Sequence, residues 1–411
     1  MSTLEILSLL FATAAIFGLL SARWLRVPIT IGTMMLTVLV SASLMLVSSR
    51  VPGIHVWAAR LMQQIDFETL ILHGMLPLLL FAGAFLLDLE HLAREKFTVS
   101  LLSIAGTTIC FLLVAVLMHW FSAGRLPWIE CFVFGALISP TDPIAVLEML
   151  RRVGVSRRIE AQLAGESLFN DGIGAVLFLT MLEIARGNAP TFSSVAGLLI
   201  AKAGGAVIVG IVAAWIASRL MRLLDSYQID ILFTVSLAFG GYVLADRMHL
   251  SAPLEAVVAG IALRRFNRRL PESRIAHEQI DRFWEVIDEI QNCVLFVLLG
   301  LEAMAITLDA SAVHAGVSAI GSVNLVRFGA VALLLGIARL CQPGHKSSLL
   351  VLTWGGLRGG LSIALALSVP ENLGRNWILG ATYLVVIFSI VIQGGSMDWI
   401  LRSRKARRVA A

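Results

Sequence analysis

Charged residues are scarce in this sequence. Asp, Glu, Lys and Arg make up 14% of its 411 residues, whereas 58% are hydrophobic and the mean hydropathy is +0.87. About a quarter of the residues of a soluble domain are charged. This composition therefore excludes a soluble protein and predicts an integral membrane protein. Long polar stretches are also lacking. The largest loop, 264–283, has room for about one short helix, which is too little for a separate soluble domain. Residues 1–401 are therefore expected to form a single transmembrane domain.

Cysteine is also rare. The four cysteines lie singly in or at the edges of apolar segments, without a Cys-x-x-Cys pair or a histidine cluster: Cys110, Cys131, Cys293 and Cys341. This spacing indicates neither a disulfide framework nor a metal centre, and no cofactor is expected. The first residues lack a basic cluster, which argues against a cleavable signal peptide.

Apolar runs of the length that crosses a bilayer recur along the whole chain. They predict an all-α polytopic membrane protein with about thirteen transmembrane helices. Twelve is the alternative, because the ninth run is short. The expected spans are 4–22, 29–48, 68–88, 98–121, 128–148, 163–184, 194–218, 228–245, 250–263, 284–302, 314–338, 347–369 and 376–401.

Loop charges indicate how the helices are oriented, because cytoplasmic loops accumulate Lys and Arg. Alternate loops place 23 of the 32 basic residues on one side, six on the other and three within spans. We therefore expect the N-terminus outside and the C-terminus in the cytoplasm. Residues 402–411 would form a short basic cytoplasmic tail that meets anionic lipid headgroups. The pI of 9.3 then reflects topology and does not indicate nucleic-acid binding.

Two spans contain helix-breaking residues at membrane depth, at 139–143 (Ser-Pro-Thr-Asp-Pro) and 355–360 (Gly-Gly-Leu-Arg-Gly-Gly). Prolines such as Pro140 and Pro143 remove backbone donors, and unwound backbone in a membrane must be buried or line a cavity. A pair of broken helices in different halves predicts a transporter built from inverted repeats, with its site between the breaks. The alternative is two ordinary kinks, but each break carries a charge, Asp142 or Arg358, that a half-helix end would stabilise.

The sixth span carries polar residues on one face. At 100° per residue, Glu166, Ser167, Asn170 and Asp171 fall within an arc of about 140°. Carboxylates within a span are costly, roughly 2.5 to 3.5 kcal/mol each on insertion scales, so they mark a site of ion or proton chemistry. We expect this face to line that site.

Each charge also has a structural alternative. Glu166 is expected to pair with Arg327, because a buried arginine keeps its proton and needs a partner. Asp171 is expected to hold a proton or a cation, although it could instead bridge helices by hydrogen bonding. For Asp142, capping of exposed amides and a direct role in the site are both open. Glu255 and Lys202, near span ends, are expected to reach solvent.

These residues belong to motifs that resemble the monovalent cation/proton antiporters of the bacterial NhaP type, relatives of the animal sodium/proton exchangers. The resemblance covers nearly the whole chain, and its motifs lie at 139–143, 165–172, 283–301 and 355–359. It implies a transporter of the bacterial inner (plasma) membrane and not an enzyme. It also implies a thirteen-helix fold with a six-helix core, two crossing broken helices, and a separate domain that forms a homodimer.

The resemblance further implies roles for individual residues. Asp171 would bind the cation or the proton, and Ser167 and the backbone at Thr141 would help to coordinate sodium. Asn170 would tie the sixth span to Thr141. The buried ion pair would be Glu166 with Arg327, and the breaks would be stabilised by Asp142 and Arg358.

The implied function is exchange of sodium, or lithium, for protons. The Asn-Asp order at 170–171 resembles the electroneutral branch, in which one carboxylate exchanges one cation for one proton. One departure concerns selectivity, since many relatives have an acid where this chain has Ala82. A potassium/proton or broad monovalent cation exchanger is therefore the first alternative. A gated cation channel and an intramembrane aspartyl protease using Asp142 and Asp171 are the other two.

Overall fold

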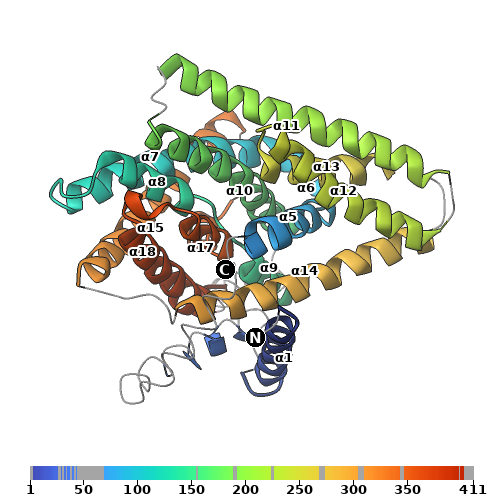
Figure 1. Ribbon diagram of the computed structural model, residues 1–411, viewed down its shortest axis with the longest axis horizontal. Helices are drawn as coiled ribbons and strands as arrows, with labels where there is room; N and C mark the ends of the chain where they lie inside the picture. Colours follow the sequence, from blue (N-terminus) through green and yellow to red (C-terminus); the bar gives the residue numbers. More distant parts are fainter. Residues whose placement is uncertain are drawn as a thin grey trace.

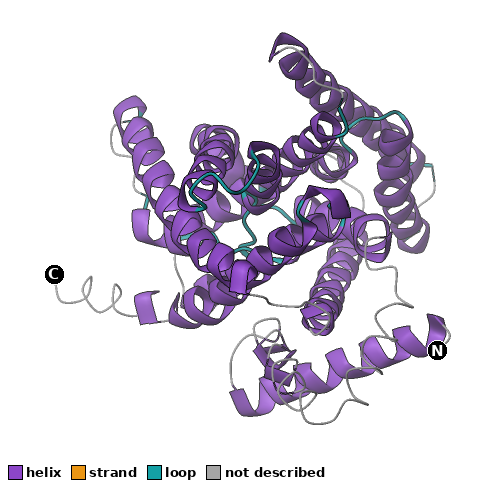
Figure 2. Cartoon of the chain, turned by 60° about the vertical axis from the view of Figure 1, so that its left-hand side comes forward, coloured by secondary structure: helices purple, strands orange, loops and turns teal. Residues whose placement is uncertain are grey.

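The computed structural model describes residues 3–25, scattered positions between 29 and 43, and then 69–153, 156–187, 192–223, 226–267, 274–303, 310–342, 347–397 and 399–401. All regular secondary structure in this part of the chain is helical, and loops connect the helices (Figure 2). The predicted span 29–48 lies mostly outside the described residues, and the basic tail 402–411 lies wholly outside them.

Most helices follow the predicted spans closely, but two begin about ten residues earlier than predicted, at Leu89 instead of 98 and at Arg274 instead of 284. Several are continuous over long distances, and α6, the π-helical segment η3 and α7 form one helix over Leu89–Phe121. The elements are α1 (Thr3–Leu20), η1 (Ser21–Leu25), η2 (Leu70–Met75), α5 (Leu76–Phe85), α6 (Leu89–Ser100), η3 (Leu101–Gly106), α7 (Thr107–Phe121), α8 (Trp128–Ile138), α9 (Ile144–Val153), α10 (Arg157–Ala185), α11 (Phe192–Met221), α12 (Tyr227–Arg247), α13 (Ala252–Asn267), α14 (Arg274–Ala303), α15 (Ala310–Cys341), α16 (Leu349–Trp354), α17 (Gly360–Leu367), η4 (Glu371–Leu373), α18 (Arg375–Phe388) and η5 (Ser389–Gly394).

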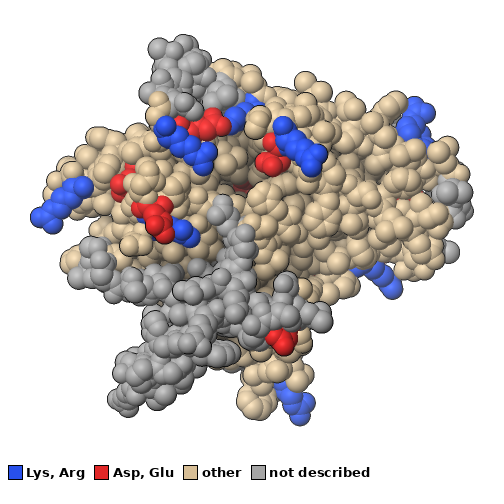
Figure 3. All heavy atoms as spheres, in the orientation of Figure 1, with Lys and Arg blue, Asp and Glu red and all other residues tan. Residues whose placement is uncertain are grey.

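The chain is a multi-pass membrane protein. Within the described residues, seven helices are long and apolar enough to cross a bilayer. Large apolar side chains cover their outer surfaces, including Trp120 at 74% exposure and Leu340 at 84%. Figure 3 shows the consequence on one face, where charged side chains form a few small groups on an otherwise uncharged surface. An all-helical polytopic fold is thus confirmed, whereas the count of thirteen spans stays a prediction.

The helices form two bundles. The broken-helix bundle comprises α6–α10 and α15–α18, in which α7 packs on α8 and α15 on both α7 and α18. The flanking bundle comprises α5 and α11–α14, in which α13 packs on α5, α11 and α12. Figure 1 places most of the first bundle on the left and the second on the right. Helix α10 joins them, because it packs on α6 and α8 on one side and on α13 and α11 on the other.

Two broken helices cross within the first bundle. Helix α8 ends at Ile138 and α9 begins at Ile144, while α16 ends at Trp354 and α17 begins at Gly360. The unwound segments pass each other antiparallel, and the Asp142 amide donates to the Leu357 carbonyl over 2.8 Å. Each broken helix stands between two long helices, which gives the same order twice along the chain. The prediction of two crossing broken helices in a repeated, inverted arrangement is confirmed.

Candidate functional site

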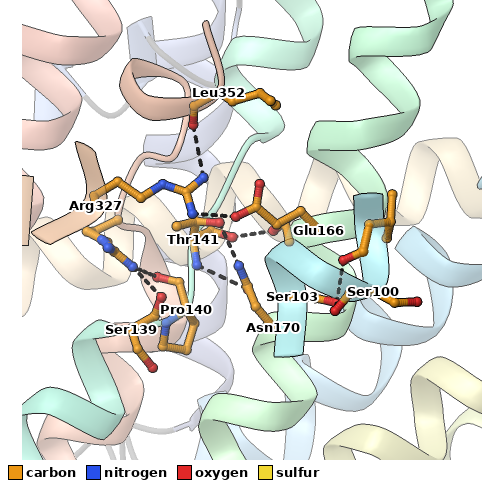
Figure 4. A network of polar contacts seen from close by, with 12 residues as sticks. Ser100, Ser103, Ser139, Pro140, Thr141, Glu166, Asn170, Arg327 and Leu352 are labelled. Atoms are coloured by element: carbon orange, nitrogen blue, oxygen red, sulfur yellow. Dashed lines mark hydrogen bonds and ion pairs between the residues drawn. The ribbon is translucent and has the colours of Figure 1, made fainter. Parts of the chain in front are cut away.

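The first break is held against α10 by a short polar network. The Asn170 side chain pairs with both the backbone and the side chain of Thr141: its Oδ1 accepts from the Thr141 amide at 3.2 Å, and its Nδ2 donates to Thr141 Oγ1 at 2.7 Å. The Ser167 hydroxyl donates to the Thr141 carbonyl. All three residues are buried, and Figure 4 shows the Asn170–Thr141 pair between the break and α10. The unwound backbone groups of Thr141 are thereby satisfied at membrane depth.

Arg358 of the second break binds the end of the first broken helix. Its guanidinium donates to the carbonyls of Ser139 and Pro140, the latter over 2.6 Å, just beyond the C-terminal end of α8. Carbonyls at a helix C-terminus carry partial negative charge, so a cation is favoured there. The Arg358 amide donates to Ser389 Oγ at 2.9 Å, and a chain of polar side chains continues from Ser389 to Gln393 and Asn324.

Glu166 and Arg327 form a buried ion pair between α10 and α15. Their side chains are 1% and 5% exposed. Arg327 also donates to the Leu352 carbonyl over 2.9 Å, in the last turn of α16 (Figure 4). Each break therefore has a buried arginine on the carbonyl end of its first half-helix, Arg358 on α8 and Arg327 on α16.

Glycines allow these segments to approach closely. A Cβ at position 174 on α10 would collide with the ring of Pro140, and one at position 359 would collide with the Asp142 side chain. Asp142 thus lies beside the start of α17, where a helix N-terminus favours an anion. Pro143 is buried directly before α9.

Asp171 differs from its neighbours on the polar face of α10. Glu166, Ser167 and Asn170 are buried and paired, whereas Asp171 is half-buried. Its carboxylate has no hydrogen bond or ion pair within the described part of the chain, and it lies close enough to Asp142 and Arg358 for their charges to interact. A carboxylate left open beside a second carboxylate can bind a proton or a small cation, because either one reduces the repulsion between the two negative charges.

Two predictions about charges near span ends are wrong. Glu255 is 0% exposed, and both of its carboxylate oxygens lack a hydrogen-bond partner among the described residues. Lys202 does not reach solvent, since it is 9% exposed and pairs with Glu183 over 2.6 Å. The Ser389–Gln393–Asn324 chain was not predicted either, because uncharged polar residues scattered over two spans give no local pattern. No group of three or more His, Cys, Asp or Glu side chains that could hold a metal occurs in the described residues.

Crossing broken helices with arginines on their half-helix ends define an ion-coupled membrane transporter of the inverted-repeat class. The particular family follows from comparison with known proteins. The chain belongs to the sodium/hydrogen exchanger family, whose transmembrane model matches residues 11–403. This is a family of transporters and not of enzymes, so the aspartyl protease alternative is wrong.

Individual relatives are similar over nearly the whole chain. The Na(+)/H(+) antiporter NhaP of Pseudomonas aeruginosa is 36% identical over 408 residues, which cover 97% of this chain and 96% of the relative. The Na(+)/H(+) antiporter NhaH of Halobacillus dabanensis is 34% identical, with 97% of both chains covered. Among solved structures, the sodium proton antiporter MjNhaP1 from Methanocaldococcus jannaschii matches with a TM-score of 0.72 at 21% identity, covering 96% of this chain and 100% of that one. That structure supports the fold.

Proposed function

We propose that this protein exchanges sodium, or lithium, for protons across the membrane. The names of the relatives, which are sodium/proton antiporters, support this assignment over almost the full length of the chain. The observation that carries the proposal is the position of Asp171: one half-buried carboxylate, unpaired among the described residues, beside the crossing of the two breaks. The other polar residues of that face are already engaged, Ser167 and Asn170 with Thr141 and Glu166 with Arg327.

In this mechanism Asp171 binds either a cation or a proton. Sodium would be held by the Asp171 carboxylate, Ser167 Oγ and the backbone at Thr141, and a proton arriving from the other side would displace it. An empty site leaves a bare charge that is costly to carry through hydrocarbon, so only the filled or protonated protein would change its orientation. One carboxylate holding one cation or one proton gives an electroneutral 1:1 exchange.

We further propose that the broken-helix bundle moves against the flanking bundle, which would form a homodimer. The N-terminus would face outward and the C-terminus the cytoplasm of a bacterial inner membrane, as the loop charges indicate. The breaks would be kept fixed within the moving bundle by a set of buried or break-forming residues: Asn170, Asp142, Arg358, Pro140, Pro143 and the Glu166–Arg327 pair. The described contacts of these residues support such a role because they lie within that bundle.

Potassium/proton or broader monovalent exchange is the second candidate. Ala82 keeps it open, because this residue supplies no side-chain oxygen where many relatives have an acid. A site with fewer charged ligands discriminates less strongly by ion size. A gated cation channel is a further alternative, and it would show no coupling between sodium and protons.

The test is recovery of a pH-sensitive dye in proteoliposomes after addition of sodium, lithium or potassium, with the voltage clamped at zero by an ionophore. The proposal predicts recovery with sodium or lithium for the wild type and none for Asp171→Asn. Recovery with potassium alone would favour the second candidate. Absence of any cation-driven recovery would contradict exchange and favour a channel or another substrate.

A further inference from the structure

Helix α14 carries polar residues that the proposed exchange does not use. With Asp288 at 0°, Gln291 lies at about 300° and Asn292 at about 40°, so the three share one face of the helix. Asp288 and Gln291 are half-buried and Asn292 is 1% exposed. These residues lie within the predicted span 284–302, where polar groups are costly unless they bind something.

Two acceptor atoms on this face have no hydrogen-bond partner in the part of the chain that the structure describes. Asn292 Oδ1 and Gln291 Oε1 are buried and make no hydrogen bond within the described residues. The other end of the Asn292 amide is fixed, because Nδ2 donates to the Asp288 carbonyl over 2.8 Å. Its free oxygen is therefore held next to Asp288. Buried acceptors left unpaired are destabilising, so their presence here points to a ligand.

The same face of α14 lies toward the crossing of the broken helices. Leu295, at about 340° on that face, packs against Gly360 at the start of α17. The preceding glycine, Gly359, packs against Asp142. The charge of Asp288 interacts with those of Asp142, Glu289 and Arg151, and the charge of Asp142 interacts in turn with that of Asp171. Three carboxylates thus follow one another from α14, through the first break, to α10.

We propose that Asp288, Gln291 and Asn292 form a second, weaker site for a monovalent cation, which holds the ion on its way to or from Asp171. One carboxylate with two neutral oxygens suits a hard cation, which prefers oxygen ligands. The small number of charges keeps binding weak enough for the ion to move on, as conduction through several sites requires. The inference rests on the proposed function in that the ion held is the one exchanged.

Binding to purified protein tests the site directly. The Asp171→Asn variant, with its main site blocked, is titrated with radioactive sodium in a scintillation proximity assay. We expect saturable residual binding that Asp288→Asn, added to this variant, removes and that Asp288→Glu retains. Glu278→Gln is the matched control, because Glu278 is also an acid of α14 but is exposed and lies about 15 Å along the helix from Asp288. No saturable binding to Asp171→Asn, or binding that Asp288→Asn leaves unchanged, would overturn the second site.

Transport separates this inference from the proposed function. In proteoliposomes, Asp288→Asn should raise the apparent KM for sodium about fivefold with little change in maximal rate, because it weakens attraction of the ion but leaves Asp171 intact. Glu278→Gln should leave the KM unchanged. An unchanged KM in Asp288→Asn overturns the second site alone. Absence of sodium-driven proton flux in the wild type would instead refute the proposed function.

Discussion

Each buried arginine at the breaks is met by groups that compensate its charge. Arg327 has the Glu166 carboxylate and the Leu352 carbonyl, and Arg358 has the carbonyls of Ser139 and Pro140. The two arginines are compensated differently, since Arg327 forms an ion pair and Arg358 binds the carbonyl end of a helix. Removal of one partner should therefore lower the free energy of unfolding by a different amount in each case.

Removing one member of the Glu166–Arg327 pair should destabilise the protein strongly. Glu166→Gln leaves Arg327 charged and buried, at a cost of about 3–5 kcal/mol. The double variant Glu166→Gln/Arg327→Gln should be less destabilised than the sum of the single variants. Thermal unfolding of the purified protein in detergent measures both effects. Additive losses in the double variant would show that the pair contributes no coupling.

Glu255 should behave in the opposite way. Its carboxyl group is buried with no hydrogen-bond partner among the described residues, so replacing it by a side chain of similar size removes a desolvation cost of about 1–3 kcal/mol. We expect Glu255→Leu to raise the midpoint of thermal unfolding, and Glu255→Gln to raise it less because an amide still lacks partners. A lower midpoint for Glu255→Leu would mean that the carboxyl group makes a stabilising contact.

At the scale of the element, the breaks depend on close approach to α10. Gly174 faces the ring of Pro140, and any larger residue there would push α10 away from the unwound backbone. The hydrogen bonds that join Asn170 and Ser167 to Thr141 depend on the same distance. A single methyl group at this position should therefore disturb the whole polar network.

Gly174→Ala should reduce exchange in proteoliposomes by at least about tenfold, the effect expected of a misplacement by a fraction of an ångström at a binding site. The matched control is Gly336→Ala, which adds the same methyl group to the long helix α15 where no residue that the structure describes lies within 4 Å. That control should leave the rate unchanged. Equal rates for the two variants would show that the approach of α10 to Pro140 has no role in transport.

Sequence alone predicted those features that have a local cause. Proline and glycine clusters at membrane depth predicted both breaks, and the need to pair a buried arginine linked Glu166 to Arg327, in contact although 161 positions apart. The burial of charged side chains near span ends was harder to predict. Glu255 lies four residues after Ser251, near the start of α13, but the neighbouring helices α11 and α12 bury that turn completely. The polar face of α14 was missed because Asp288 lies among charges of a span end that resemble a solvated region.

At the scale of the whole molecule, the two bundles meet along α10. Gly172 of α10 packs against Leu254 of α13, and Glu183 of α10 pairs with Lys202 of α11 over 2.6 Å. Within the flanking bundle, Arg264 of α13 pairs with Asp281 of α14. If one bundle moves against the other, the Glu183–Lys202 pair must separate during transport. The Arg264–Asp281 pair lies within one bundle and must not separate.

Cross-linking distinguishes these two pairs. Glu183→Cys/Lys202→Cys, in a background without the four native cysteines, should lose exchange when a short thiol cross-linker is added. Arg264→Cys/Asp281→Cys, treated in the same way, should keep most of its activity. Exchange that survives complete cross-linking of the first pair would rule out movement between α10 and α11.

The central claim is that sodium and protons compete for Asp171. The most direct measurement is the apparent KM for sodium in proteoliposomes as a function of pH, at zero voltage. Because the cation binds only the deprotonated carboxylate, the KM should rise as the pH falls, approaching about tenfold per pH unit once Asp171 is mostly protonated. The maximal rate should be restored by enough sodium. A KM that stays constant across the titration would contradict a shared site and require separate groups for the two ions.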